Sequence, residues 1–552
     1  RRTRERPPRA LPDRHLRPSQ AVLTLPQHKH HPRPNIYTTM LVKTYAAALQ
    51  SIQARTVTIE VSCTRGSYFQ LVGLPDTAIK ESQDRIISAI ESSGYKFPGK
   101  RIVINMSPAD LRKEGAAYDL PLAIGLLAAD GQIPSDLLEH YMIMGELSLD
   151  GAVRPIHGAL PIAIQARSEG YRGFILPEAN AREAAVVNKL EVHAARSLRE
   201  VIGMLTGEAS LPIIEVDTRG EFYRGIQSET FDFSEVKGQE TVKRALEVAA
   251  AGGHNLLMIG APGSGKSMMA KRLPSILPPF TLGESLETTK IYSVAGKLGK
   301  DVTLMTTRPF RAPHHSISPV ALVGGGSNPQ PGEISLAHNG VLFLDELPEF
   351  SRNVLEVMRQ PLEERVVTVA RARYTVDYPA SFMLVAAMNP CPCGYYNHPT
   401  HACECTPQQV QRYLGKVSGP LLDRIDLQVE IVPVDFEKLS DARPSESSEH
   451  IRERVLAARE IQTQRFAPYP EVHCNAQMTP RLMQLFARPD AEGLEKLRLA
   501  MERLDLSARA YDRILKVART IADLAGSEEI RKEHIAEAIH YRSLDRASWG
   551  QR

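Results

Sequence analysis

The chain has 552 residues, of which 43% are hydrophobic and 24% charged, and its formal net charge is +3. This length is several times the usual domain size of about 100–200 residues, so we expect more than one domain. No apolar run approaches the roughly 20 residues that span a bilayer, there is no secretory signal pattern, and six cysteines are too few for a disulfide scaffold. The composition excludes an integral membrane protein and favours a reducing, cytoplasmic setting.

Residues 1–39 differ from the rest of the chain in composition. They hold nine basic residues against Glu5 and Asp13, a net charge of +7 that leaves residues 40–552 at −4. They are rich in proline and histidine and show no hydrophobic periodicity. We predict a disordered basic extension ahead of a native start at Met40, with a genuine basic tail as the alternative. The overall positive charge is therefore no indication of nucleic-acid binding.

Residues 40–206 combine the period-2 pattern of strands with the period-3.6 pattern of helices, which predicts an α/β domain. The clearest strands are expected at 55–61 and 101–106, and the clearest helices at 77–93 and 120–129. Residues 207–229 turn polar and aperiodic and are expected to be a linker.

Residues 230–433 alternate strands and helices in the order of a doubly wound parallel sheet. Strands are expected at 255–259, 340–344 and 381–388, and a helix at 267–273. In residues 434–552 apolar side chains recur at helical spacing, as in Ile451, Val455, Ala458 and Ile461 and again in Ile514, Val517, Ile521 and Leu524, which predicts a helical C-terminal domain.

A phosphate-binding loop follows the first strand of the second domain. Its sequence GAPGSGKS lies between an apolar strand and a helix, which is the context that such a loop requires. Glycines let backbone amides face the phosphates, Lys266 reaches the β and γ phosphates, and Ser267 binds Mg²⁺. We predict that ATP is bound by Gly260, Ala261, Pro262, Gly263, Ser264, Gly265, Lys266, Ser267 and Met268.

Two insertions are expected between the strands of this domain. Residues 305–336 are rich in Pro, Gly and His and are long for a loop, which favours a functional role. Residues 366–369 and 374–378 indicate two strands on either side of Ala370-Arg-Ala-Arg373, a hairpin with a basic tip. Such a tip fits a polyanion, although a solvated hairpin end is the alternative.

Two acidic residues and an asparagine are predicted at the carboxyl edge of the same sheet. Asp345 and Glu346 end one apolar strand and Asn389 ends another. Asp345 would hold Mg²⁺, Glu346 would polarise the attacking water, and Asn389 would orient that water. Arg424 and Arg509 are candidates for an arginine that a neighbouring subunit supplies to the γ-phosphate.

Four cysteines follow Asn389 directly. Cys391, Cys393, Cys403 and Cys405 have the spacing C-x-C-x₉-C-x-C, with His398 and His401 between the pairs. Four thiolates can close a tetrahedral zinc site, although one-residue spacing is shorter than usual. A reduced, metal-free loop is the alternative.

Five stretches together resemble the ComM/YifB-type, magnesium-chelatase-like AAA+ family. The resemblance runs from about Met40 to Asp545, and its motifs are highly specific as a set. They are FRAPHHS at 310–316, PGEISLA at 331–337, GVLFLDELPE at 340–349, NPCPCG at 389–394 and SGPLLDRID at 418–426. The resemblance implies a Lon-protease-like N-terminal domain at 40–206, an AAA+ ATPase domain at 230–433 and a helical lid at 434–552.

The resemblance also implies roles for single residues. Arg424 matches the trans-acting arginine finger, Arg509 the lid arginine, and residues 305–336 a pore loop. Arg371 matches the place where related DNA motors bind the phosphate backbone, and Arg373 lies beside it. In the Lon-like part Ala117 and Leu160 replace the serine and lysine of an active peptidase, which leaves a scaffold or DNA-handling element rather than a protease.

Two functions are compatible with the sequence. The family implies a hexameric ATPase that acts on DNA, as a branch-migration helicase in homologous recombination and natural transformation. The alternative is a chelatase-like or protein-remodelling ATPase that works with a partner protein. The basic hairpin tip favours DNA.

Overall fold

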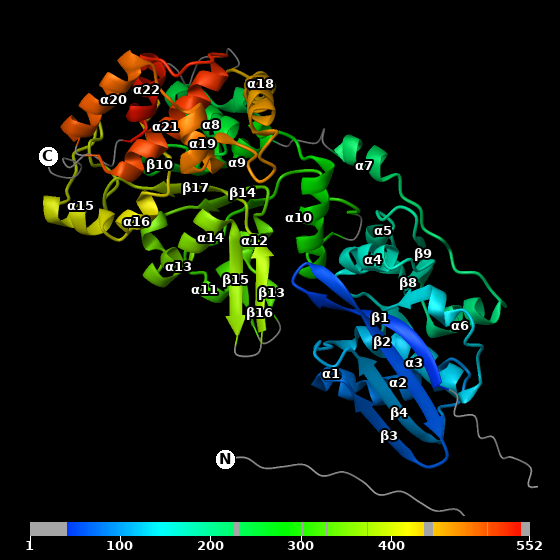
Figure 1. Ribbon diagram of the computed structural model, residues 1–552. Coiled ribbons are helices and arrows are strands. Elements are labelled where there is room, and N and C mark those ends of the chain that lie inside the picture. The colour runs from blue at the N-terminus through cyan, green and yellow to red at the C-terminus, as the bar shows by residue number, and fades with distance from the viewer. Residues whose placement is uncertain are drawn as a thin grey trace, which may run out of the picture. The chain divides into compact units, whose positions relative to one another are not determined.

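The computed structural model describes residues 41–225, 231–299, 302–326, 329–371, 374–434, 445–504 and 506–542 (Figure 1). The predicted extension at 1–39 and Arg373 of the hairpin tip lie outside these residues. No helix within the described part of the chain is long and apolar enough to cross a bilayer.

A seven-stranded mixed sheet, in the order β3-β4-β2-β1-β5-β8-β9, forms the centre of the N-terminal part. The long strands β1 and β2 pair antiparallel, as do β2 and β4, whereas the other neighbours run parallel. The strands are β1 (Leu41–Gln50), β2 (Gln53–Thr64), β3 (Tyr68–Val72), β4 (Arg101–Ser107), β5 (Tyr141–Ile143), β8 (Gly173–Pro177) and β9 (Glu191–Ala195).

Helices cover this sheet, and the most apolar of them is α3 (Asp119–Asp130), which is buried along almost its whole length. Its run of Leu, Ile and Ala packs against β1 and β2. The helix expected at 77–93 is divided at Glu81 into α1 and α2. The remaining bounds are α1 (Thr77–Lys80), α2 (Ser82–Ser92), α4 (Ala159–Ser168), α5 (Glu178–Ala184) and α6 (Leu198–Thr206), with the short strands β6 (Glu146–Leu147) and β7 (Val153–Arg154).

The stretch expected to be an aperiodic linker contains a helix, α7 (Thr218–Gly225). Thr218 and Phe222, one turn apart, are buried, and Phe222 belongs to the N-terminal core. Two buried positions are too few to give a visible periodicity in the sequence. The polar, aperiodic stretch therefore contains a short helix, and its role as a linker remains a prediction.

A second, fully parallel sheet carries the nucleotide motifs, in the order β11-β14-β17-β10-β18. This confirms the predicted α/β class with a parallel sheet. Every residue of β10, β14 and β17 is buried, because helices lie on both faces of such a sheet. The strands are β10 (Leu256–Gly260), β11 (Phe310–Arg311), β14 (Val341–Leu344), β17 (Met383–Met388) and β18 (Leu427–Ile431).

The helices of this part are mostly short. They are α8 (Glu240–Gly252), α9 (Lys266–Arg272), α10 (Leu282–Val294), α11 (Pro319–Val323), α12 (Glu333–Leu336), α13 (Arg352–Val357), α14 (Arg359–Glu364), α15 (Pro407–Leu414) and α16 (Gly419–Leu422). Two small ribbons stand apart from the sheet: β12 (Gly324–Gly325) with β13 (Gln330–Pro331), and β15 (Val366–Arg371) with β16 (Tyr374–Pro379). The predicted hairpin at 366–378 is therefore present.

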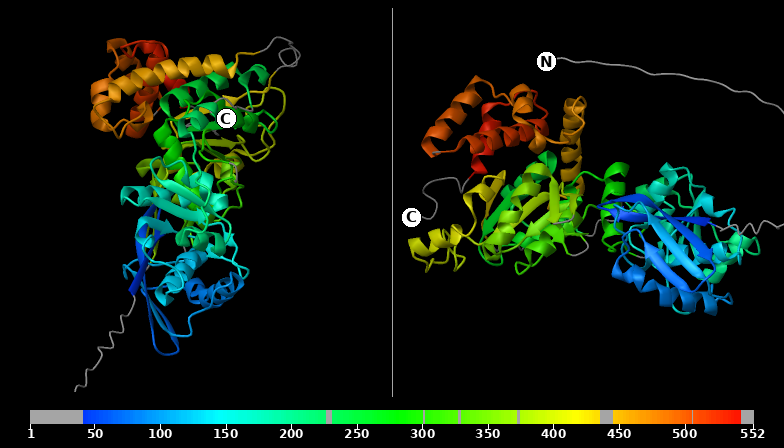
Figure 2. Two further views of the ribbon diagram at one scale, coloured as in Figure 1. Left: turned by 90° about the vertical axis from the view of Figure 1, so that its right-hand side faces the viewer. Right: turned by 60° about the horizontal axis from the view of Figure 1, so that its bottom comes forward.

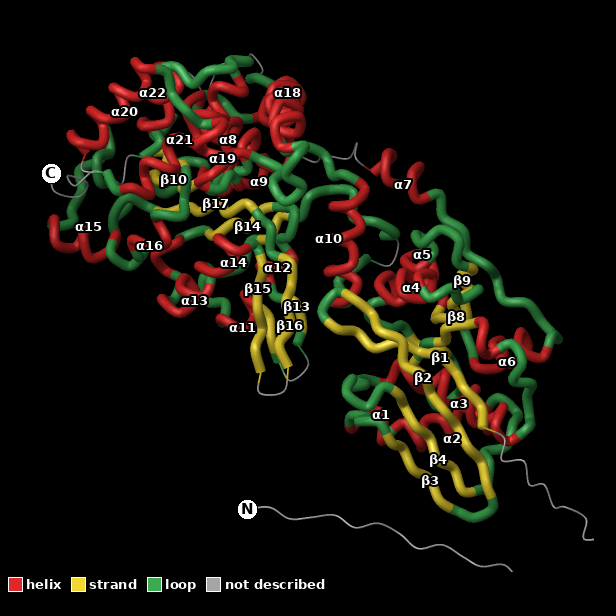
Figure 3. The backbone as a smooth tube through the Cα atoms, in the orientation of Figure 1, coloured by secondary structure: helices red, strands yellow, loops and turns green. Residues whose placement is uncertain are grey.

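The C-terminal part is helical, as predicted, and Figure 3 shows its helices in red. It contains α18 (Ser448–Phe466), α19 (Pro480–Phe486), α20 (Ala491–Leu504), α21 (Ala508–Leu524) and α22 (Lys532–His540). Figure 2 shows α18, in orange, from two further sides. Both α18 and α21 pack against α8, and all three share one apolar core with β10 and β18.

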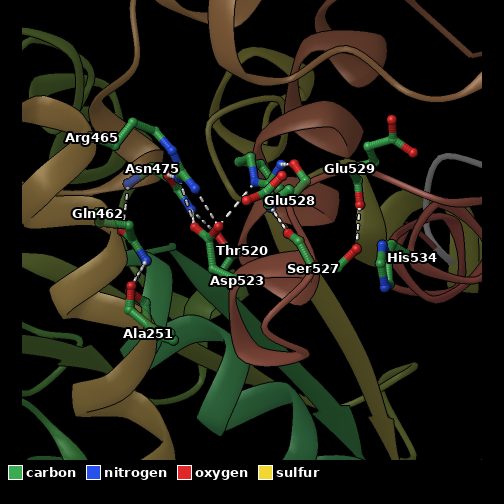
Figure 4. A network of polar contacts seen from close by, with 12 residues as sticks. Ala251, Gln462, Arg465, Asn475, Thr520, Asp523, Ser527, Glu528, Glu529 and His534 are labelled. Carbon is green, nitrogen blue, oxygen red and sulfur yellow. Dashed lines mark hydrogen bonds and ion pairs between the residues drawn. The ribbon is translucent and has the colours of Figure 1, made fainter.

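Buried polar contacts reinforce this packing (Figure 4). Asp523 of α21 accepts from Arg465 of α18 at 2.8 Å and from Asn475 at 2.7 Å, and its side chain is fully buried. Gln462 of α18 donates to the carbonyl of Ala251 in α8 at 3.0 Å. The helical part is thus joined to the nucleotide-binding part by satisfied polar groups as well as apolar contacts.

A second cluster of buried polar side chains, centred on Asp426, lies close to that of Asp523. His254, just before β10, is within 2.7 Å of Thr520 in α21 and 3.4 Å of Asp426, which precedes β18. Arg513 of α21 is 2.9 Å from the same carboxylate. Burial opposes its ionisation, yet Arg513 and His254 hold the pKa of Asp426 below its usual range. The carboxylate therefore stays ionised between the sheet and α21.

Candidate nucleotide site

The loop from Gly260 to Gly265 turns directly out of β10 into α9. Gly263 and Gly265 have φ of 75° and 92°, in the left-handed region that favours glycine. At Gly260 a Cβ atom would lie 2.8 Å from the carbonyl oxygen of Ile431, so only glycine fits there. Backbone geometry therefore explains why these three positions of the motif are glycines.

The amino group of Lys266 is folded back onto this loop. It donates to the carbonyls of Gly260 at 2.7 Å and Ala261 at 2.9 Å, and it lies 3.2 Å from Oδ1 of Asn389. Burial lowers the pKa of Lys266, and the nearby carboxylates of Asp345 and Glu346 oppose this shift. The structure thus brings together Lys266 and Asn389, which the sequence separates widely.

Ser267 and Asp345 face each other from neighbouring elements. The Ser267 hydroxyl donates to Oδ2 of Asp345 at 2.5 Å, and Oδ1 of Asp345 accepts from the backbone N–H of Glu346 at 2.9 Å. A hydroxyl and a carboxylate oxygen in contact are a donor set that suits Mg²⁺. The predicted pair fits the metal of a magnesium–nucleotide complex.

The loop itself holds an unsatisfied polar atom. The hydroxyl oxygen of Ser264 is buried and has no hydrogen-bond partner within the described part of the chain. An orphaned buried hydroxyl costs free energy unless a ligand or water satisfies it. Ala261 is buried, whereas Met268 on α9 is exposed. The unsatisfied hydroxyl of Ser264 fits a phosphate chain that lies along the loop.

Glu346 and Asn389 line one pocket with Arg412, Tyr413 and Lys416. Glu346 has φ of 53°, an uncommon value for a residue with a side chain. Its carboxylate lies 3.3 Å from Nδ1 of His315, for which no role was predicted beyond its place in the motif FRAPHHS. No local pattern indicates this contact, because it joins two separate segments.

The two candidate arginines lie together, away from the phosphate-binding loop of their own chain. Arg424 binds Glu363, and Arg509 lies 2.9 Å from Asp423. Both arginines line a second pocket, which shares no lining residue with the pocket at Glu346. Within one chain, the structure therefore does not bring them to Lys266.

The four cysteines converge. Their sulfur atoms all lie within 4.8 Å of one another, and those of Cys391 and Cys403 are 3.7 Å apart. Zinc bound by four thiolates at about 2.3 Å places its sulfurs about 3.8 Å apart, so the cluster fits a tetrahedral ion. His398 and His401 face each other instead, with ring centroids 4.9 Å apart.

The cysteine loop also contacts the nucleotide loop. A Cβ atom on Gly394 would lie 2.5 Å from Cδ of Pro262. Tyr413 of α15, which follows Cys405 closely, lines the pocket at Glu346. The cluster therefore lies between two segments of the candidate nucleotide site.

The basic hairpin is only partly described. Arg371 is the last residue of β15 and pairs in register with Tyr374 of β16, and Arg373 lies outside the described residues. The segment 305–336 is not a single long loop, since it contains β11, α11, β12, β13 and α12.

Three stretches of the chain match models of known protein families. Residues 232–439 match the family "Magnesium chelatase, subunit ChlI", residues 445–542 match its C-terminal family, and residues 59–180 match "Subunit ChlI of Mg-chelatase".

Several full-length relatives are similar. The chain is 46% identical to competence protein ComM of Haemophilus influenzae over 91% of its length and 97% of that protein. It is 44% identical to YifB of Escherichia coli over 91% of the chain and 97% of that protein. The 38 kDa subunit of magnesium chelatase from Rhodobacter capsulatus is 24% identical over 55% of the chain and 84% of that subunit.

Proposed function

Because the chain belongs to the ComM and YifB family of magnesium-chelatase-like AAA+ proteins, which implies ATPase activity, we propose that it is a ring-forming motor that acts on DNA. We further propose that the ring is a hexamer in the cytoplasm and that it drives branch migration during recombination and natural transformation. The observation that supports an ATP-driven reaction best is the convergence of Lys266, Ser267, Asp345 and Asn389.

The chain's own residues divide the work of hydrolysis. Lys266 holds the β and γ phosphates once they replace the carbonyls that it now contacts, and Ser267 and Asp345 hold Mg²⁺. Bound Mg²⁺ would neutralise charge on the phosphates. Glu346 accepts a proton from the attacking water, and Asn389 orients that water.

The arginine pocket supports a ring. Arg424 and Arg509 share one pocket that contains no residue of their own phosphate-binding loop. In a ring, that face can meet the nucleotide of the next chain, so each chain completes its neighbour's site. Both arginines are proposed to act in this way.

The proposed substrate is DNA, bound by the hairpin of β15 and β16. Two arginines per chain, repeated around a ring, would form a salt-sensitive track for a phosphate backbone. The N-terminal part is proposed to be Lon-like but not proteolytic, since Ala117 and Leu160 offer neither nucleophile nor base. It would support the ring or contact DNA.

The first test is the ATPase rate of the full chain with single-stranded, duplex and four-way-junction DNA at several salt concentrations. Stimulation that decreases with salt is expected. Intact basal turnover without stimulation by any DNA would instead favour a protein or chelatase partner, an alternative that the similarity to magnesium-chelatase subunits supplies.

Changing Arg371 and Arg373 together to Ala is expected to weaken DNA binding and flatten its salt dependence, while basal ATPase is retained. Binding would be measured by fluorescence anisotropy across a salt series. The matched control changes Arg481 and Arg488, two exposed arginines of the helical part. Equal DNA affinity of the hairpin variant and the wild type at every salt concentration would contradict the DNA contact.

The cysteine cluster is proposed to bind structural zinc. Purified protein is expected to contain about one zinc per chain, and Cys403→Ser to lose it and unfold at lower temperature. Metal content would be measured by mass spectrometry and stability by thermal unfolding. Cys63→Ser, outside the cluster, should retain the zinc. A stable wild-type protein without metal would rule the site out.

A further inference from the structure

We propose that one face of the N-terminal sheet binds single-stranded DNA, with Tyr68 stacked on an unpaired base and Arg101 on the adjoining phosphate. The inference rests on the proposed action on DNA and deepens it, because it gives the N-terminal part a contact of its own and names the form of DNA that it holds.

The two faces of this sheet differ along strands β1 to β4, which Figure 1 shows in blue. On one face Val61 and Ile104 are fully buried, and α3 packs against β1 and β2. Thr44 lies on the same face, where it donates to the carbonyl of Pro121 in α3 at 3.2 Å. Because side chains alternate between the faces of a strand, the residues between these point away from α3.

The opposite face is open on β3 and β4. We call open face the side chains that these two strands carry there, which are Tyr68, Gln70, Val72, Arg101, Val103 and Asn105. Val103 and Asn105 are half-buried and the others are exposed, with 53% of the surface of Tyr68 accessible. An exposed aromatic ring that a strand holds in place is a platform on which a base can stack.

Strand pairing places Tyr68 and Arg101 side by side. Tyr68 pairs in register with Arg101, which pairs in register with Thr64 of β2. Since paired strands lie about 4.8 Å apart, the tyrosine ring and the guanidinium can reach the same ligand. A Cβ atom on Gly66 would lie 3.3 Å from Cβ of Arg101, so the turn between β2 and β3 lies against this arginine. A base stacked on the ring would bring its phosphate to Arg101.

The charge of this surface suits a polyanion. Glu60 of β2 continues the row of the open face, but Lys43 lies 3.3 Å from its carboxylate and compensates it. Asp130, which ends α3, is likewise paired with Lys100 at 2.6 Å. Arg101 therefore gives the described part of the surface a positive excess, which attracts phosphate.

A single strand is the occupant that fits this chemistry. The major groove of duplex DNA, about 12 Å wide, admits a helix or a two-stranded ribbon. Four strands about 4.8 Å apart are roughly 14 Å across, so the sheet is too wide to enter the groove. Stacking on Tyr68 also requires an unpaired base. Residues 1–39 precede β1, but their net charge of +7 has the sign of the surface and disfavours them as its occupant.

The test measures binding of the full chain to a fluorescent single-stranded oligonucleotide by anisotropy, without nucleotide and across a salt series. Tyr68→Ala is expected to weaken binding at least about fivefold, because the loss of one stacked base costs that much or more. Tyr68→Phe keeps the ring and should bind as the wild type. Arg101→Ala should weaken binding and reduce the slope of log affinity against log salt by about 0.7, the value of one phosphate contact.

Two variants serve as matched controls. Tyr223→Ala removes a tyrosine of α7 that is 67% exposed, and Arg167→Ala removes an exposed arginine of α4. Both should bind single-stranded DNA as the wild type does. Thermal unfolding of each variant would show whether it is folded.

A second measurement locates the contact. An oligonucleotide that carries 5-iododeoxyuridine would be irradiated with the full chain, and the crosslinked peptide would be identified by mass spectrometry. A crosslink to Tyr68 is expected in the wild type. Wild-type affinity of folded Tyr68→Ala or Arg101→Ala would overturn the inference and leave the open face to a protein partner, and crosslinks found only at other positions would also overturn it.

The two proposals fail in different ways. If DNA leaves the ATPase rate of the wild type unchanged while Tyr68→Ala and Arg101→Ala lose affinity, the DNA motor is wrong and the binding surface stands. If DNA stimulates the ATPase while both variants bind as the wild type, the motor stands and the binding surface is wrong.

Discussion

Lys266→Ala is expected to reduce ATP turnover by at least about a hundredfold, because removal of one preorganised charged donor from a reacting phosphate costs that much or more. Lys266 contacts the carbonyls of Gly260 and Ala261 and the side chain of Asn389, and no other α9 side chain that the structure describes makes these contacts. The measurement is phosphate release at saturating Mg·ATP, with nucleotide affinity measured separately.

Lys271→Ala is the matched control for this prediction. Lys271 lies on the same helix, α9, but is exposed. Its loss should leave turnover within about twofold of the wild type, since surface substitutions rarely disturb a site. If folded Lys266→Ala protein still hydrolysed ATP at the wild-type rate, the whole nucleotide site would be misassigned.

Arg424→Ala is expected to reduce turnover by at least about a thousandfold, the lower end of the range for an arginine that stabilises the transferred phosphoryl group. In the structure its guanidinium donates to Glu363 and to the carbonyl of Pro420, and the pocket that it lines contains no residue of the phosphate-binding loop. Arg509→Ala should act in the same direction. The assay is ATPase activity at a protein concentration at which assembly is confirmed by light scattering.

Mixing of inactive chains tests whether Arg424 acts on a neighbour. Arg424→Ala retains an intact phosphate-binding loop, and Lys266→Ala retains an intact arginine. Their mixture should regain activity, because some sites combine the sound loop of one chain with the sound arginine of the next. Arg503→Ala, an exposed arginine of α20, is the control that should remain active alone. No recovery in mixed rings would place Arg424 outside the neighbour's site.

The sequence predicted the parallel sheet because its strands are buried on both faces. Such strands are continuous apolar runs, and the run expected at 255–259 became β10 (Leu256–Gly260) with a shift of one residue. Short elements were less predictable. The helix α7 buries Thr218 and Phe222 only, and the two-residue strands β12 and β13 exist through pairing with each other. Neither case leaves a periodic pattern.

The residues of the candidate site also differ in how far the sequence could predict their positions. The glycines, Lys266 and Ser267 are contiguous, so their geometry follows from one strand, one turn and one helix. The sequence could place Asn389 near Asp345 and Glu346 because the carboxyl ends of parallel strands lie at the same edge of the sheet. The contact of His315 with Glu346 could not, because it depends on how an irregular segment packs over Phe350. Nor could the partners Glu363 and Asp423, which are fixed by tertiary packing alone.

The buried polar groups between the sheet and the helical part have a mechanical consequence. Removing one partner of a buried charge pair costs about 3–5 kcal/mol, and the buried carboxylate of Asp426 with Arg513 of α21 is such a pair between the sheet and the helical part. If the helical part swung away from β10 and β18, this pair would have to open together with the contacts of His254 with Thr520 and of Gln462 with the carbonyl of Ala251. The nucleotide-binding part and the helical part are therefore expected to move together as one rigid body.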